Sequence, residues 1–264
     1  MSYKSRSIKI VTISTLLLLI FTLEPKGQFF TLPPLPPDYK FGNILINRTS
    51  EKNNVKPATF SHWIHRQKHT CRVCHFELEF NFQVNTTEIT EAANKAGMYC
   101  GASGCHDGKT VFGHDRPHCE KCHNGNITYG KEKFSELSGL PKAKFGNGID
   151  WVKAMDKDMI KPAHYLMIMP LPLEGFTFNK ILLLEAEMFG IPPAIFPHNP
   201  HIQWLDCNNC HPDVFTVKKK ETQHFSMEKI LQKKFCGVCH LNVAFPMDHC
   251  NRCHPLMSDY WGKY

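Results

Sequence analysis

The residues of this chain most suited to binding a cofactor are its twelve cysteines, because of their spacing and the histidines beside them. All of them fall into pairs, and a histidine directly follows each pair. Five pairs enclose two residues: Cys71–Cys74–His75, Cys119–Cys122–His123, Cys207–Cys210–His211, Cys236–Cys239–His240 and Cys250–Cys253–His254. The sixth, Cys100–Cys105–His106, encloses four residues. No cysteine is left over, so one kind of chemistry must account for all of them.

The pattern CxxCH is typical of covalent c-type haem attachment. Two thiols bond the two vinyl groups on one edge of the porphyrin, and the next residue then lies under the ring, where its imidazole binds the iron. Zinc sites and redox dithiols also use C-x-x-C pairs, but neither needs a histidine after every pair. The sequence therefore predicts six covalently bound haem c groups. The six motif histidines are the predicted iron ligands, and the twelve cysteines are the predicted attachment sites.

The composition favours a fold built around these cofactors. Only 42% of the 264 residues are hydrophobic, and 18 are prolines. Without haem such a chain could hardly bury enough apolar surface to fold. We therefore expect a haem-wrapped small fold with little regular secondary structure, made of short helices and loops. The formal charge of +7 does not indicate a nucleic-acid partner, because each haem brings two propionates against one positive charge on its ferric core.

The first 27 residues resemble an export signal. Three basic residues precede an apolar run at 10–23. This run is shorter than the ~20 residues of a spanning helix and suits a signal-peptide core. No clean small-x-small cleavage site follows, so a cleaved signal peptide and an uncleaved N-terminal membrane anchor both remain open. Either one predicts an exported protein, in the periplasm or at the outer surface, and in bacteria covalent haem attachment takes place outside the inner membrane.

The chain contains an internal repeat. "FSHWIHRQKHTCRVCH" at 60–75 matches "FPHNPHIQWLDCNNCH" at 196–211 with a constant offset of 136. The offset falls to 134 at Cys105 and Cys239, because the first copy has two extra residues inside its middle motif. Each copy contains three haem motifs, so we predict two modules, module 1 at 57–125 and module 2 at 193–264. A signal peptide or anchor (1–27) and a proline-rich linker (28–56) are predicted before module 1. A connector (126–192) with one helix that ends near Pro162 is predicted between the modules.

The stretch "FSHWIH…CRVCH…YCGASGCHDGKTVFG…CEKCHNG" resembles the triheme c7-type module of the cytochrome c3/c7 family, and the second copy resembles it as well. In that family the first histidine of HxxH is the distal ligand of the first haem, and the second reaches the middle haem. The resemblance therefore implies four ligand pairs: His62 with His75, His65 with His106, His198 with His211, and His201 with His240.

The third haem of each module departs from the family pattern. Small c7 proteins have its distal histidine four residues before the middle motif, where this chain has Ala96 and Gln232. Some tandem members use methionine here, and methionine ligation raises the potential. In module 1 the preferred candidate for this ligand is His114, and Met98 and His118 are the next choices. In module 2 the candidates are Met227 and His224.

These features predict a protein that relays electrons between other cytochromes or redox proteins. Six-coordinate iron does not readily bind substrate, but it changes oxidation state with little reorganisation. One alternative is a multihaem reductase of a small oxyanion or metal ion, which needs a five-coordinate haem. Another is a structural subunit that associates with itself into a longer haem chain.

Overall fold

The computed structural model describes residues 32–167, 178–186, 190–215 and 225–257. The chain divides into two units, Met1–Pro33 and Pro34–Tyr264, and the second is described below. The predicted export segment 1–27 and His224 lie outside the described residues. In the described ranges, no helix has both the length and the apolar character to cross a membrane.

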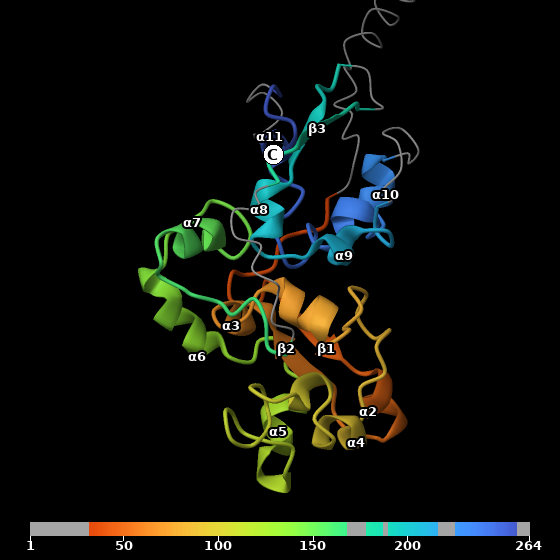
Figure 1. Cartoon of the computed structure of the whole chain (residues 1–264), viewed down its shortest axis with the longest axis vertical. Coiled ribbons are helices and arrows are strands. Elements are labelled where there is room, and N and C mark those ends of the chain that lie inside the picture. Colours follow the sequence, from red (N-terminus) through yellow and green to blue (C-terminus); the bar gives the residue numbers. More distant parts are fainter. Residues whose placement is uncertain (1–31, 168–177, 187–189, 216–224, 258–264) are drawn as a thin grey trace, which may run out of the picture. The chain divides into compact units, whose positions relative to one another are not determined.

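Short elements separated by loops make up the fold, as the sequence predicts (Figure 1). The first half contains β1 (Asn43–Ile46), α2 (Arg48–Lys52), β2 (Ala58–Ser61), α3 (His62–Arg66), a π-helical turn (Val73–Glu77), α4 (Glu91–Lys95), 3₁₀ turns at Tyr99–Gly101 and Arg116–His118, and α5 (Cys119–Cys122). The rest contains α6 (Lys131–Phe134), a 3₁₀ turn (Ser135–Gly139), α7 (Trp151–Asp156), β3 (Ile181–Leu184), β4 (Ala194–Pro197), α8 (Asn199–Ile202), α9 (Cys207–Cys210), α10 (Met227–Leu231), a 3₁₀ turn (Phe235–Val238) and α11 (Cys250–Cys253).

Each copy of the repeat begins with an antiparallel hairpin. β1 pairs with β2 so that Asn43 lies opposite Ser61, and β3 pairs with β4 so that Ile181 lies opposite Pro197. The strands β2 and β4 are offset by 136, like the haem motifs. The strand β1 lies in the segment predicted as a linker, and β3 lies in the predicted connector. The structural repeat is therefore longer than the repeat that the motifs indicate.

The glycine after the first cysteine of each middle motif is required by a close backbone approach. A Cβ on Gly101 would lie 1.8 Å from the carbonyl oxygen of Asn94, and a Cβ on Gly237 would lie 1.8 Å from that of Ile230. Only glycine lets the chain pass this close to the preceding helix. The chain therefore makes the same sharp bend into the middle motif of each copy, after α4 in the first copy and after α10 in the second.

The connector contains more than the one helix predicted there, and that helix ends earlier. Both α6 and α7 lie between the modules, and α7 stops at Asp156, well before Pro162. The cause is local: Asp158 adopts the left-handed conformation (φ 55°), and the N–H of Met159 bonds the carbonyl of Ala154 at 2.9 Å. This arrangement closes the helix without proline.

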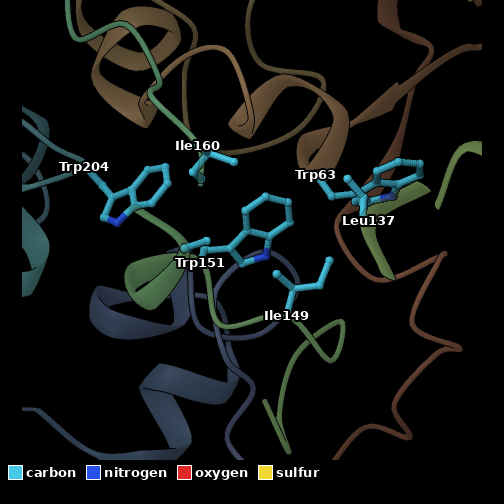
Figure 2. Packing of buried hydrophobic residues seen from close by; sticks show 7 residues of the cluster. Trp63, Leu137, Ile149, Trp151, Ile160 and Trp204 are labelled. Carbon is cyan, nitrogen blue, oxygen red and sulfur yellow. The ribbon is translucent and has the colours of Figure 1, made fainter. Parts of the chain in front are cut away.

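The main apolar cluster of the described residues draws on both modules and the connector (Figure 2). Trp151 of α7 lies between Trp204 and Trp63 in this view. The cluster consists of Trp63, Leu137, Ile149, Trp151, Ala154, Ile160 and Trp204. Polypeptide packing is therefore concentrated between the modules, while a smaller cluster of Val73, Leu78 and Ala102 lies inside module 1.

Candidate haem-binding sites

Three of the six cysteine pairs form single helical turns. α5, α9 and α11 each begin at the first cysteine of a motif and end at the second. Residues three apart on a helix share a face, so both thiols of such a pair point the same way. None of the twelve cysteines, all of which lie in the described residues, forms a disulfide bond. This arrangement suits two bonds to one edge of a flat cofactor.

Every motif histidine is held by a backbone carbonyl through Nδ1. A carbonyl oxygen only accepts, so Nδ1 carries the proton and Nε2 keeps its lone pair. Histidines that bind metals commonly donate their other ring N–H in this way. The six contacts are His75 to Phe80 (2.7 Å), His106 to Phe112 (3.2 Å), His123 to Lys56 (2.9 Å), His211 to Phe215 (2.7 Å), His240 to Phe245 (3.1 Å) and His254 to Pro192 (2.6 Å).

The four histidines of the two HxxH segments are held in the same manner. Two of the acceptors, Gly42 and Lys180, lie just before β1 and β3. The hairpins therefore fix the first histidine of each HxxH. The module boundaries predicted from the motifs leave β1 and β3 out and so do not reveal this role. The contacts are His62 to Gly42 (2.7 Å), His65 to Ser61 (2.9 Å), His198 to Lys180 (2.8 Å) and His201 to Pro197 (2.8 Å).

A phenylalanine in each hairpin fixes the two HxxH rings relative to each other. The Phe60 ring stacks on His65 at 4.3 Å and meets His62 edge-on at 4.9 Å. The Phe196 ring does the same with His201 at 4.5 Å and His198 at 4.9 Å. The phenylalanine of the FxHxxH pattern is thus a positioning residue for both candidate ligands.

In two of the four implied ligand pairs the two imidazole rings lie next to each other. The ring centres of His65 and His106 are 6.2 Å apart, and those of His201 and His240 are 6.1 Å apart. A metal bound to two imidazoles, each at about 2 Å, separates their ring centres by about 6 Å. These two pairs therefore fit one iron each. In the described part of the chain, no direct ring contact joins His62 with His75 or His198 with His211.

Burial favours the neutral form of several candidate ligands. It lowers the pKa of His62 to about 3, and the pKa values of His65 and His240 to about 4 each. The neutral imidazole is the form that binds metal. Burial also raises the pKa of the Cys74 and Cys100 thiols to about 12 each. In the described residues no group of three or more His, Cys, Asp or Glu side chains could hold a metal ion, and the cysteine pairs, each followed by a histidine, fit haem c.

A family model described as "Cytochrome c7 and related cytochrome c" matches residues 58–124 and 194–255. This chain is a tandem c7-type multihaem cytochrome. The match confirms the resemblance on which the ligand pairs depend, and with it covalently bound haem c as the cofactor. Multihaem cytochromes of this kind are generally exported electron carriers that exchange electrons with other redox proteins.

Two solved structures are similar to this cytochrome. The C-terminal hexahaem fragment of GSU1996 is 23% identical, with 84% of this chain and 99% of that chain covered and a TM-score of 0.27. The dodecahaem cytochrome c GSU1996 is also 23% identical, with 82% and 75% covered and a TM-score of 0.28. No curated protein matches this chain.

Among the described candidates for the sixth ligand of the third haems, neither His114 nor His118 has the bond from Nδ1 to a backbone carbonyl that the ten other histidines share. The Nε2 atom of His114 is buried without a hydrogen-bond partner. Met98 is 51% exposed, and Met227 begins α10. The Nδ1 atom of His118 bonds a carboxylate oxygen of Asp115 at 2.6 Å.

Comparison of the two modules adds a candidate that the sequence analysis missed. Met247 takes the place of His114, because each lies two residues after the phenylalanine that holds the middle-motif histidine and directly before an aspartate. Asp248 bonds His249 at 2.9 Å, just as Asp115 bonds His118. The signal was present in "FGHD" and "FPMD", but two residues inserted before Cys119 obscure the alignment.

Proposed function

We propose that this cytochrome binds six haem c groups in two modules and relays electrons between redox partners outside the cytoplasm. The observation that carries the proposal is the set of ten histidines with Nδ1 bound to a backbone carbonyl, at equivalent positions in both modules. We assign each module its hairpin as well, so that module 1 spans 42–125 and module 2 spans 180–255. The four HxxH histidines and the six motif histidines are the proposed iron ligands.

Bound haem supplies a reversible one-electron change at iron. The side chains around it determine how easily that change occurs. His65 and His106 would hold one iron with two imidazoles, and an iron with both positions filled would have none open for substrate. An Nδ1 proton shared with a carbonyl increases the donor strength of Nε2, which favours ferric iron and a lower potential. Rings held by backbone and by Phe60 or Phe196 move little when the charge changes.

The partners that fit this arrangement are other cytochromes or redox proteins. Such partners need only come close to a haem, and no substrate pocket is required. An N-terminal export segment supports a location in the periplasm or at the outer surface. Self-association into a longer haem chain would serve the same function with a second copy as the partner.

The stoichiometry is tested by the intact mass of the exported protein. Six haems are expected, including one at the widened Cys100–Cys105 motif. A mass corresponding to five haems would show that four-residue spacing defeats attachment. The pairing of His65 with His106 would then be wrong, whereas that of His201 with His240 would remain.

The relay is tested by redox titration with electron paramagnetic resonance. We expect reversible titration of all irons, only low-spin signals in the oxidised protein, and weak carbon monoxide binding in the reduced protein. A stoichiometric high-spin haem that binds nitrite or carbon monoxide tightly would instead support the reductase alternative. The open iron would then be expected at the Cys119–Cys122 or Cys250–Cys253 motif, where the sixth ligand is least defined.

A further inference from the structure

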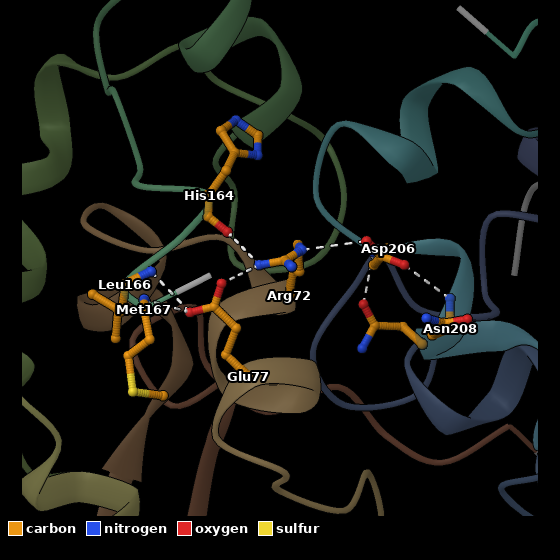
Figure 3. A network of polar contacts seen from close by, with 8 residues as sticks. Arg72, Glu77, His164, Leu166, Met167, Asp206 and Asn208 are labelled. Carbon is orange, nitrogen blue, oxygen red and sulfur yellow. Dashed lines mark hydrogen bonds and ion pairs between the residues drawn. The ribbon is translucent and has the colours of Figure 1, made fainter. Parts of the chain in front are cut away.

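The first haem motif of module 1, Cys71–Cys74, is in direct contact with module 2. Arg72 lies between its two cysteines, and the backbone N–H of Arg72 donates to the carbonyl of Trp204 at 3.0 Å. The Arg72 Nε atom lies 3.3 Å from a carboxylate oxygen of Asp206, which caps α9 (Figure 3). Because α9 is the Cys207–Cys210 motif, a haem motif of one module touches the start of a haem motif of the other.

A buried ion pair holds Arg72 in this position. The Arg72 side chain is 7% exposed and pairs with Glu77, whose side chain is 0% exposed. Arg72 also donates to the carbonyl of His164 at 3.0 Å, and its guanidinium carbon lies 4.1 Å from the ring centre of Tyr165. Figure 3 shows Arg72 between Glu77 and Asp206. Turning this guanidinium away from module 2 would leave a buried carboxylate unpaired, which is strongly destabilising.

Four backbone N–H groups bond the connector to the same part of module 1. They are those of Thr70 (to Ala163, 3.0 Å), Ala163 (to Lys68, 2.7 Å), Leu166 (to Glu77, 2.8 Å) and Met167 (to Glu77, 3.2 Å). Residues 163–167 therefore run beside the first motif and satisfy the second carboxylate oxygen of Glu77. The buried pair thus connects three parts of the chain: module 1, the connector and module 2.

The apolar cluster between the modules adds a second attachment at the same place. The guanidinium carbon of Arg66, at the end of α3, lies 5.4 Å from the ring centre of Trp151 and 5.4 Å from that of Trp204. Both tryptophans belong to the cluster, and Cys71 of the first motif packs against it. Domains are expected to move relative to each other unless a large apolar interface joins them. Here apolar and polar contacts both join the modules beside one motif.

The second ligand implied for the first motif also lies near module 2. The carbonyl of Gly42 holds His62, the histidine that the family resemblance pairs with His75. A Cβ on Gly42 would lie 3.9 Å from the carbonyl oxygen of Asn242, two residues after the motif histidine His240. Module 2 therefore approaches this motif from the side of the distal ligand as well as from the side of the cysteines.

The last motif of module 1, Cys119–Cys122, is exposed and packs within its own module. Cys119 and both residues between the two cysteines are exposed. The helix α5 packs against β2, and His123 bonds the carbonyl of Lys56 at 2.9 Å. The order of the motifs along the chain would join this motif to the first motif of module 2. The contacts of Arg72 instead join the first motif of module 1 to it.

We propose that the two modules meet at the Cys71–Cys74 motif, that the Arg72–Glu77 pair holds this motif against module 2, and that the modules exchange electrons here and not at Cys119–Cys122. The exchange rests on the proposed electron-transfer function. It is a one-electron step in which one iron site is oxidised as another is reduced, and no bond or proton is involved. The buried pair keeps the separation of the two sites constant.

The attachment is tested by hydrogen exchange of the full-length haem-loaded protein and its Glu77→Gln variant. Exchange of the N–H groups at 70–72 and at 163–167 should become about 100-fold faster in the variant, because a buried charge has lost its partner. Exchange at 118–125 should keep its wild-type rate. Asp213→Asn is the matched control, since Asp213 is the exposed residue of module 2 at the position of Glu77, and it should leave all rates unchanged.

Faster exchange at 163–167 alone would contradict the attachment. It would show that the pair holds the connector to module 1 while the bond from Arg72 to Trp204 persists without it.

The meeting of two motifs is tested by redox titration of charge variants. A charge between two iron sites acts on both, so Asp206→Asn should raise two midpoint potentials and Arg72→Gln should lower the same two. Asparagine also caps helices, so α9 should persist in Asp206→Asn. Asp213→Asn, two residues after His211, should raise no more than one potential. Intact mass establishes that each variant retains its haems.

The outcomes separate this inference from the proposed function. If Asp206→Asn and Arg72→Gln shift different potentials or only one, the modules do not meet at this motif, and the relay stands. If a single variant of the buried pair yields no folded protein, the double variant Arg72→Gln, Glu77→Gln takes its place, because it leaves no buried charge unpaired. If the wild type shows no reversible titration, the electron-transfer function is wrong, and hydrogen exchange still decides the attachment.

Discussion

The two modules hold their candidate ligands with the same backbone groups despite different side chains. The first HxxH histidine bonds the carbonyl of Gly42 in module 1 and of Lys180 in module 2, and the third motif histidine bonds that of Lys56 or Pro192. A carbonyl is available whatever the side chain, so these positions tolerate glycine, lysine or proline. The geometry of the ligands is therefore preserved by the hairpin backbone, which the motif spacing alone does not reveal.

The modules differ where they face the rest of the chain. Inside its first motif, module 1 has the buried Arg72, while module 2 has the exposed Asn208 at the equivalent position. Asn208 takes part in local helix capping, since its N–H bonds Asp206 at 3.1 Å. The repeat thus supplies two similar frames, and the residues that differ between them determine which motif contacts the connector and the other module.

The largest expected effect comes from breaking the buried pair in module 1. Glu77→Gln removes the charge that compensates Arg72, and the loss of one partner of a buried pair costs about 3 kcal/mol. The position in module 2 that matches Arg72 is the exposed Asn208, so Asn208→Ala should change the stability by less than about 0.5 kcal/mol. Denaturant unfolding of the two haem-loaded variants measures this difference. Equal effects would show that the modules do not differ here.

The same carboxylate gives a pH dependence. Burial alone would raise the pKa of Glu77, but the hydrogen bonds from Leu166 and Arg72 outweigh it and lower the pKa below 4.5. A carboxyl group whose pKa is lower in the folded than in the unfolded protein stabilises the fold at pH values above the unfolded-state pKa. This contribution is lost as the pH falls through the folded-state pKa. The stability difference between wild type and Glu77→Gln should therefore be full near neutral pH and shrink below about pH 4.5. A difference that grows on acidification would contradict this assignment.

A smaller effect should be the same in both modules. Gly101→Ala and Gly237→Ala each force a Cβ into a backbone carbonyl, and overpacking of this kind costs about 1–3 kcal/mol. Gly139→Ala is the control, because nothing lies within 4 Å of its added Cβ. Thermal unfolding should show similar losses for the first two variants and none for the third. A loss confined to one module would mean that the bends are not equivalent.

The sequence predicts the cofactor, the repeat and the sparse secondary structure, because all three depend on covalent motifs with fixed spacing. It does not predict the hairpins, because "NILI" and "ILLL" lie outside the motifs and their pairing is a tertiary event. Nor does it predict the contact between the modules, which depends on residues far apart in sequence, such as Arg72 and Asp206. The end of α7 was misplaced because the left-handed residue Asp158, not Pro162, terminates it.

The smallest expected effect on stability concerns the sixth ligand of the third haem. Met227 corresponds to Glu91, which bonds Lys95 at the surface of module 1, whereas Met247 corresponds to His114. If the repeat conserves ligand positions, His114 and Met247 are the pair, and Met227 only lies nearby. Met247→Ala should then abolish the weak sulfur-to-iron absorption band in the red and lower one potential, since thioether ligation raises it. Met227→Ala should leave both unchanged, and stability should change by no more than about 1 kcal/mol in either variant. Loss of the band in Met227→Ala alone would restore the ligand predicted from sequence and show that the modules differ at this haem. A band that survives both substitutions would exclude these two methionines as its source.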